Sequence, residues 1–165
     1  MKLLLLCLVA LLPPFVSNSQ QNPCRLKIVT DKLANTKIAY TPDVELVSGT
    51  NKMNLHFYKT GHSIVFSVVV TSGELFCVDF TSSAVIQFKD GSAITLKASN
   101  NGNCTGNFQS SIYDNLSPAD IQALSTKSII SVKILGKGQE ADFKESDADS
   151  QRVQHYFKCV KDLEF

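Results

Sequence analysis

The sequence predicts an α+β fold: a predominantly antiparallel sheet built from hairpins, with one short helix and a C-terminal helix packed on the sheet. Several short segments alternate apolar and polar residues, as strands do when one face is buried. Turn residues such as Thr60-Gly61 and Asp90-Gly91 separate neighbouring segments, which is typical of hairpins. Helical spacing of apolar residues follows Ser117 and Ser146, two residues suited to begin helices.

The chain of 165 residues has the size of one ordinary domain. Hydrophobic residues make up 44% and charged residues 19%, which excludes a disordered, collagen-like or coiled-coil protein. Without Lys2 the chain holds equal numbers of positive and negative side chains, so the basic footprint of a nucleic-acid-binding protein is absent. We therefore expect a single domain and no nucleic-acid partner. With the leader described next, we expect a signal peptide at residues 1–19 and a single exported domain at 20–165.

The first residues have the pattern of a secretory signal peptide. Met1 and Lys2 precede an apolar run from Leu3 to Leu12, which is shorter than the roughly 20 residues that span a bilayer. Ser17-Asn18-Ser19 supplies small residues before a cut ahead of Gln20. No second apolar segment of that density follows, so the sequence predicts export to the periplasm or the exterior, without a stable membrane span.

Three strands are expected in the first half of the mature chain. Residues 25–30 and 52–58 alternate polar and apolar side chains. Residues 64–71 are apolar on both faces, which indicates a strand in the centre of its sheet. An even-length loop around Thr60-Gly61 joins the second and third strands, and the expected register places Phe57 opposite Ile64, Leu55 opposite Phe66 and Met53 opposite Val68.

The next hairpin joins residues 84–88 to residues 92–96. A two-residue Asp-Gly loop would pair Phe88 with Ala93, whereas a three-residue loop, Lys89-Asp90-Gly91, pairs Ile86 with Ile94. We favour the three-residue loop because Gly91 accepts the left-handed conformation that its bulge requires.

The second half predicts an edge strand, a helix, a hairpin and a final helix. A polar loop at residues 99–107 precedes the edge strand at 108–116. Ser117-Pro118-Ala119-Asp120 is a helix-starting motif. The hairpin places Ile130, Val132 and Ile134 on one face of its first strand. After the turn at residues 136–138, Ala141 and Phe143 lie on the returning strand. The last helix begins near Ser146, and its apolar stripe consists of Val153, Tyr156, Phe157, Val160 and Leu163.

Cysteine usage predicts two disulfides. Cys7 lies in the leader, and four cysteines remain in an exported chain: Cys24, Cys77, Cys104 and Cys159. We favour Cys24–Cys159, which ties the chain ends, together with Cys77–Cys104, which closes around the Asp90-Gly91 hairpin. The competing set, Cys24–Cys77 with Cys104–Cys159, stays open and requires the last helix to meet the loop at 99–107.

No catalytic, cofactor-binding or metal-binding residues are expected. The histidines His56, His62 and His155 do not have zinc-ligand spacing from the cysteines, and we expect them at three separate surface or rim positions. Acidic residues on strands and turns could converge in space to give the paired carboxylates of a glycoside hydrolase, but no pattern indicates that they do; they are Glu74, Asp79, Asp90, Asp142 and Glu145. Asp147 and Asp149 resemble the start of a calcium loop, yet Arg152 and Lys158 stand where Gly and Glu are required.

Residues 80–161 carry a resemblance to a known group of proteins. Its elements are the hairpin from Ile86 to Leu96, the Ser-Pro-Ala-Asp-Ile-Gln-Ala-Leu helix start, the strand Ile130 to Ile134, and the closing Phe157-Lys158-Cys159. Together they resemble an uncharacterised family of small exported domains from Bacteroidota-type bacteria. The family has no known activity, so the resemblance implies compartment and fold and assigns no functional residue.

These observations lead to an expected function of a general kind. We expect an exported, non-catalytic binding or accessory module that acts on an unknown envelope or extracellular protein, without a cofactor. One alternative is a carrier of a small apolar ligand, because the two-sided apolar strand at 64–70 could line a cavity. Another is a hydrolase of an unfamiliar type, which needs carboxylates or histidines from different strands to meet in a cleft.

Overall fold

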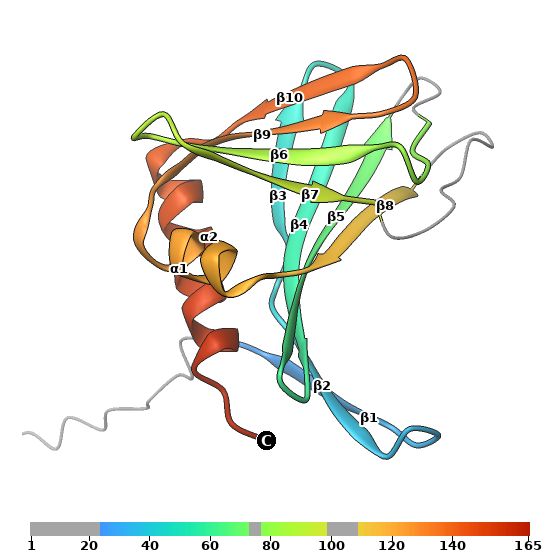
Figure 1. The fold of residues 1–165 in the computed structure, drawn as a ribbon, viewed down its shortest axis with the longest axis vertical. Coiled ribbons are helices and arrows are strands. Elements are labelled where there is room, and N and C mark those ends of the chain that lie inside the picture. The colour runs from blue at the N-terminus through green and yellow to red at the C-terminus, as the bar shows by residue number, and fades with distance from the viewer. Residues whose placement is uncertain (1–23, 73–76, 99–108) are drawn as a thin grey trace, which may run out of the picture.

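A computed structural model describes residues 24–72, 77–98 and 109–165. Two antiparallel sheets and two helices make up this part of the chain (Figure 1). The predicted α+β fold class is confirmed. The expected signal peptide at 1–19, the polar loop at 99–107, Glu74 and Cys104 lie outside the described residues.

The first sheet has six strands, and the long strand β4 lies at its centre, where it pairs with β2, β3 and β5. Strands β1, β2, β4, β5 and β8 follow one another across the sheet, and β3 also pairs with β4. β2 and β3 share one edge of β4 because β2 pairs with residues 58–60 and β3 with residues 51–55. The bounds are β1 Lys27–Asp31, β2 Thr36–Tyr40, β3 Val44–Ser48, β4 Asn51–Thr60, β5 Ser63–Ser72 and β8 Gln109–Asn115.

The second sheet has four strands in the order β10-β9-β6-β7. It crosses the upper half of the first sheet in Figure 1. The bounds are β6 Ser83–Phe88, β7 Ala93–Lys97, β9 Ile129–Leu135 and β10 Glu140–Lys144.

Both helices begin where the sequence predicts them. α1 spans Pro118–Thr126, and Ser117 and Asp120 form a reciprocal capping box at its start. α2 spans Asp147–Lys161, and the Ser146 side chain accepts a hydrogen bond from the backbone N–H of Asp149. Figure 1 shows α2 running alongside the sheets, with α1 beside it.

One cluster of buried side chains joins the two sheets and α2. Phe57 of β4 is at its centre, with the ring of Phe66 at 5.4 Å and the ring of Phe157 at 5.0 Å, both edge to face. The predicted helix face is confirmed at Val153, Phe157 and Val160. Other members of the cluster are Met53, Leu55, Val68, Val70, Ile86, Leu124, Val132, Ile134 and Phe143.

The hairpin between β4 and β5 has the expected even loop length but a different register. Thr60 pairs with Ser63, so the loop is Gly61-His62 and Phe57 lies opposite Phe66, whereas we expected Ile64. The predicted pairing is therefore wrong by two residues. Gly61, with φ +55°, occupies the first loop position, where a type II′ turn needs a positive φ. A shift of two residues keeps the same side chains facing the core, which is why the alternation could not distinguish the registers.

The hairpin between β6 and β7 confirms the three-residue loop. Ile86 pairs with Ile94 and Ala84 with Leu96. Gly91 has φ +82°, in the left-handed region that the bulge requires.

At the start of β9 the predicted buried face is wrong. Ile130 is 44% exposed, while its neighbour Ile129 is buried. The register shifts between Gln87, which pairs with Ser131, and Phe88, which pairs with Ile129. This bulge leaves Ile130 without a partner residue on β6, so its side chain turns away from the core. Val132 and Ile134 are buried as predicted.

Candidate functional site

The disulfide between Cys24 and Cys159 joins the start of the described chain to the last turn of α2. The predicted pairing of these two cysteines is confirmed. Their Cα atoms are 5.6 Å apart, and 135 positions separate them in the sequence. Cys77 is also disulfide-bonded. Its expected partner, Cys104, lies outside the described residues, so the second pairing stays a prediction.

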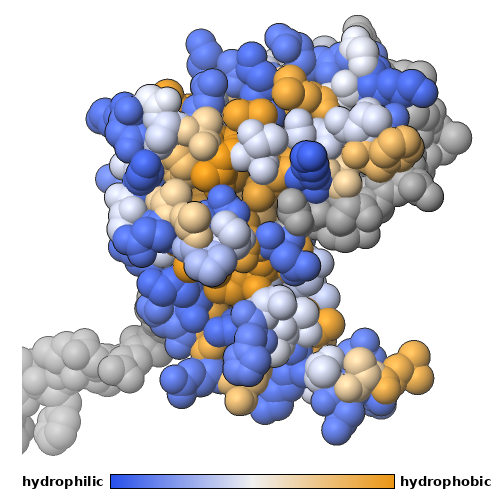
Figure 2. Space-filling view, viewed as in Figure 1, coloured by the Kyte–Doolittle hydropathy of each residue, from blue (hydrophilic) through white to orange (hydrophobic). Residues whose placement is uncertain are grey.

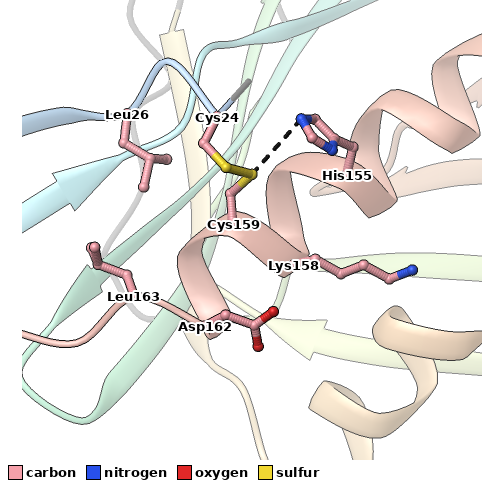
Figure 3. A pocket seen from close by; sticks show the side chains of 7 residues that line it. All are labelled: Cys24, Leu26, His155, Lys158, Cys159, Asp162 and Leu163. Carbon is pink, nitrogen blue, oxygen red and sulfur yellow. Dashed lines mark hydrogen bonds between the residues drawn. A yellow bond between two sulfur atoms is a disulfide. The ribbon is translucent and has the colours of Figure 1, made fainter. Parts of the chain in front are cut away.

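An open depression of about 430 Å³ surrounds this disulfide. Figure 3 shows its lining, which comes from the segment before β1 and from the end of α2. Leu26 and Leu163 supply apolar walls, and Lys158 and Asp162 supply opposite charges. Both cysteines line this depression and are partly exposed to solvent.

His155 lies beside the disulfide because it precedes Cys159 by four residues on α2 and so shares its face. Its Nε2 atom is 3.8 Å from Sγ of Cys159 (Figure 3). One ligand atom from each of Cys24, His155 and Cys159 lies within 4.8 Å of the other two. This group was not predicted from the sequence, although the His-x-x-x-Cys spacing places two of its three residues on one face of a helix. The approach of Cys24 depends on the fold.

The hairpin of β1 and β2 starts near the C-terminal end of α2 and projects from the body of the molecule (Figure 1). The Asp31 carboxylate shapes its tip by accepting hydrogen bonds from the backbone N–H groups of Leu33 and Ala34, at 2.8 and 3.1 Å. Leu33 is 100% exposed there, and Ile28 of β1 is 53% exposed. Figure 2 shows hydrophobic atoms at the outer end of this arm.

The same hairpin carries an excess of positive charge and an open strand edge. Lys27, Lys32 and Lys37 are exposed, and the Asp31 carboxylate is engaged in the turn. β1 stands at the end of the strand order and pairs with β2. Its other edge therefore presents backbone N–H and C=O groups without a partner strand in the described part of the chain.

The other two histidines lie on different elements from His155. His56 of β4 is largely buried, with Nδ1 at 3.2 Å from the Asp43 carboxylate but outside hydrogen-bond geometry. Burial lowers the pKa of His56, and the negative charge of Asp43 partly opposes this. His62 is exposed in the loop between β4 and β5.

The described carboxylates considered from the sequence lie at separate places in the chain, and two of them, Asp79 and Asp90, hold local turns. Asp90 bonds Ser92 within its turn and pairs with Lys127 at 2.9 Å, and these contacts hold its pKa far below the usual range. Asp79 accepts bonds from Thr81 and Ser82 in another turn, which also lowers its pKa. Asp142 lies on β10, opposite Lys133 of β9.

Glu145 lies between β10 and α2 and, unlike Asp79 and Asp90, does not hold a turn. Both of its carboxylate oxygens are buried and have no hydrogen-bond partner within the described part of the protein. Burial, followed by the nearby negative charge of Asp149, raises the pKa of Glu145 to about 7.

Comparison of the chain with protein-family models, curated proteins and solved structures found no significant match. Among residues 24–72, 77–98 and 109–165, neither helix is long and apolar enough to cross a membrane. The functional argument therefore depends on the geometry of the disulfide end and of the projecting hairpin.

Proposed function

We propose that this protein is an exported, non-catalytic binding module whose β1–β2 hairpin docks on an extended, acidic segment of an envelope or extracellular protein. The observation that carries the proposal is the hairpin itself: an arm outside the body, with Leu33 fully exposed at its tip. Leu33 shares this arm with Ile28, which is 53% exposed, and exposed apolar side chains grouped on one projecting element favour a contact surface.

The open edge of β1 supplies the main interaction. An extended segment of a partner can add to this edge as a further strand, so that backbone hydrogen bonds provide affinity. Leu33 and Ile28 then lose exposed apolar surface, and full burial of one such side chain contributes about 2 kcal/mol.

Charge selects the class of partner. Lys27, Lys32 and Lys37 repel a second copy of the same positive hairpin, which protects an open edge against self-association. An acidic segment is attracted to the same side chains, which increases its rate of association and its specificity. We therefore commit to a different, acidic protein as the partner.

The interior supports a binding module over a carrier of a small ligand. The two-sided strand β5 directs Ile64, Phe66 and Val68 into the core, where each is at most 5% exposed among packed neighbours. These side chains fill the space that the carrier hypothesis assigns to a ligand. The leader pattern and the resemblance to exported domains support the proposed compartment.

The test compares hairpin variants of the exported protein in pull-downs from an envelope extract, followed by binding of the purified partner. Leu33→Ser removes the apolar tip, and Lys27→Glu combined with Lys37→Glu reverses the charge. Val47→Ser is the matched control, since Val47 is 57% exposed on β3, away from the hairpin. We expect at least a tenfold loss of affinity in both hairpin variants and no loss in the control.

Hydrogen exchange on the purified complex provides the second measurement. We expect the partner to slow exchange of backbone amides in Lys27–Asp31 while leaving β9 and β10 unchanged. A partner that binds Leu33→Ser as tightly as the natural protein, or recovery of lipid with no protein partner, overturns the proposal.

A further inference from the structure

We propose that Cys24, Cys159 and His155 form a zinc-binding site when a dithiol reductant opens the disulfide. Two thiolates and one imidazole are three of the ligands that Zn²⁺ accepts in tetrahedral sites, and water from the depression fills the fourth position. The inference stands independently of the proposed docking function of the hairpin.

The ligand atoms are already close to the positions that zinc requires. They lie within 4.8 Å of one another. In a tetrahedral site with Zn–S bonds of about 2.3 Å, the two sulfur atoms are separated by about 3.8 Å. The Cα atoms of the two cysteines, 5.6 Å apart, leave room for this separation through rotation of the side chains alone. In the disulfide form, Nε2 of His155 already lies 3.8 Å from Sγ of Cys159, which is close to the ligand-to-ligand distance of such a site.

The backbone that carries the ligands is held by contacts other than the disulfide. α2 is anchored in the core by Val153, Phe157 and Val160. Lys59 of β4 adds to this by donating from Nζ to the carbonyl oxygens of Lys161 and Leu163, at 3.2 and 2.6 Å. On the other side, β1 is held by its pairing with β2. These contacts do not involve the disulfide, so we expect the helix and the strand to stay in place after reduction.

Both reductant and metal can reach the site. Cys24 and Cys159 are partly exposed, and His155 is exposed. The depression opens on the sulfur atoms, so a thiolate can attack one of them. Lys158 lines the same depression, and its positive charge offsets part of the negative charge of two thiolates.

The chemistry balances in two steps. A dithiol transfers two electrons and two protons to the disulfide: the S–S bond breaks, two cysteine thiols form, and the reductant becomes a disulfide. Zn²⁺ then displaces the two thiol protons and accepts an electron pair from each sulfur and from the imidazole nitrogen.

Cobalt(II) is the probe, because thiolate-to-cobalt charge transfer gives an absorption band that reports sulfur ligation. The full exported protein is reduced with a phosphine, separated from the reductant without air, and titrated with Co²⁺. Zn²⁺ is then added to displace the cobalt. Circular dichroism of the reduced protein is recorded alongside to establish that it remains folded.

Three variants assign the ligands. Cys24→Ser combined with Cys159→Ser leaves Cys77 unchanged and removes both proposed sulfur ligands. His155→Ala removes the imidazole and leaves the disulfide able to form. His62→Ala is the matched control, because His62 is equally exposed but lies in the loop between β4 and β5.

We expect one equivalent of Co²⁺ with a charge-transfer band in the reduced natural protein, and none in the oxidised protein or the double serine variant. His155→Ala should weaken Co²⁺ binding at least tenfold, and His62→Ala should leave it unchanged. The same band in the double serine variant places the metal elsewhere and overturns the proposal. An unfolded reduced protein, or a folded one without the band, overturns it as well.

Discussion

Glu145 is a carboxyl group in a place where ionisation is unfavourable. It lies between β10 and the cap of α2, with both oxygens buried and the negative charge of Asp149 nearby. Its pKa rises from 4.5 to about 7, so the folded state binds a proton that the unfolded chain has already released between these two pH values. The free energy of unfolding therefore falls as pH rises from about 4.5 to about 7, and the loss is complete above that range.

Glu145→Gln removes this loss. The variant should be more stable than the natural protein at pH 8, by up to about 3 kcal/mol for a shift of this size, and equally stable near pH 4. Urea unfolding at a series of pH values measures the difference. Glu140→Gln is the control, because Glu140 is exposed at the start of β10 and should leave the pH dependence unchanged. A constant difference between Glu145→Gln and the natural protein from pH 4 to pH 8 contradicts the assignment.

At the residue scale, local chemistry was predictable and long-range neighbours were not. Gly91 and Ser117 could be assigned from sequence because a turn and a cap depend on a few adjacent residues. The burial of Glu145 could not, since it depends on elements that pack around the β10–α2 junction. The exposure of Ile130 follows from a bulge that alternation alone does not show.

Among the elements, α2 closes one side of the core by packing against β4. Phe157 is fully buried with its ring against Phe57, and Val153 and Val160 flank it. Phe157→Ala should lower the free energy of unfolding by about 3 kcal/mol because it leaves a cavity among these side chains. Thermal or urea unfolding measures the change, and Lys158→Ala, at an exposed neighbour, should change stability by less than about 0.5 kcal/mol.

Removal of the whole helix is the stronger form of the same test. A chain that ends before Asp147 should not fold, because three apolar side chains would leave the sheet face uncovered. A cooperative melting transition in this truncated chain would show that α2 is an appendage.

Both helices could be predicted because their capping residues lie close together in the sequence. β2 and β3 were not predicted. Val44, Glu45 and Leu46 do alternate, but this segment is short, and its burial depends on pairing with β4. The β4–β5 register was wrong for a related reason: alternation identifies a face, and only the loop residues determine the offset.

For the molecule as a whole, the Cys24–Cys159 bond is a large constraint on the unfolded chain. Replacing both residues by Ser should lower the free energy of unfolding by as much as about 5 kcal/mol in the chain-entropy model, since the closed loop spans 135 positions. Urea unfolding of the double variant measures this loss. A variant as stable as the natural protein would show that the bond constrains little.

Peptide mapping without reductant tests the remaining pairing. We expect a peptide with Cys77 linked to a peptide with Cys104. A Cys104–Cys159 link would contradict both that prediction and the structure.

The Cys24–Cys159 pairing could be predicted because these residues lie near the two ends of the domain expected at 20–165, and the four cysteines of that domain form an even set. The histidine at this site could not be assigned, because Cys24, one of its two neighbours in the group, comes close only after the segment before β1 has packed against α2. The sequence also gave no indication of the projecting hairpin, because the exposure of Leu33 is known only once the fold is known.

The bond between Cys24 and Cys159 also turns residues 24–159 into a covalent ring that includes the projecting hairpin. Lys32 and Leu33 stand at the exposed tip of this arm, where a protease would find the backbone accessible. A single cleavage between them would open the ring without dividing the molecule, because the short fragment stays attached through Cys24 and the long one through Cys159. Loss of the arm would need a second cut or a reductant, so the disulfide keeps a nicked protein in one piece wherever no reductant is present.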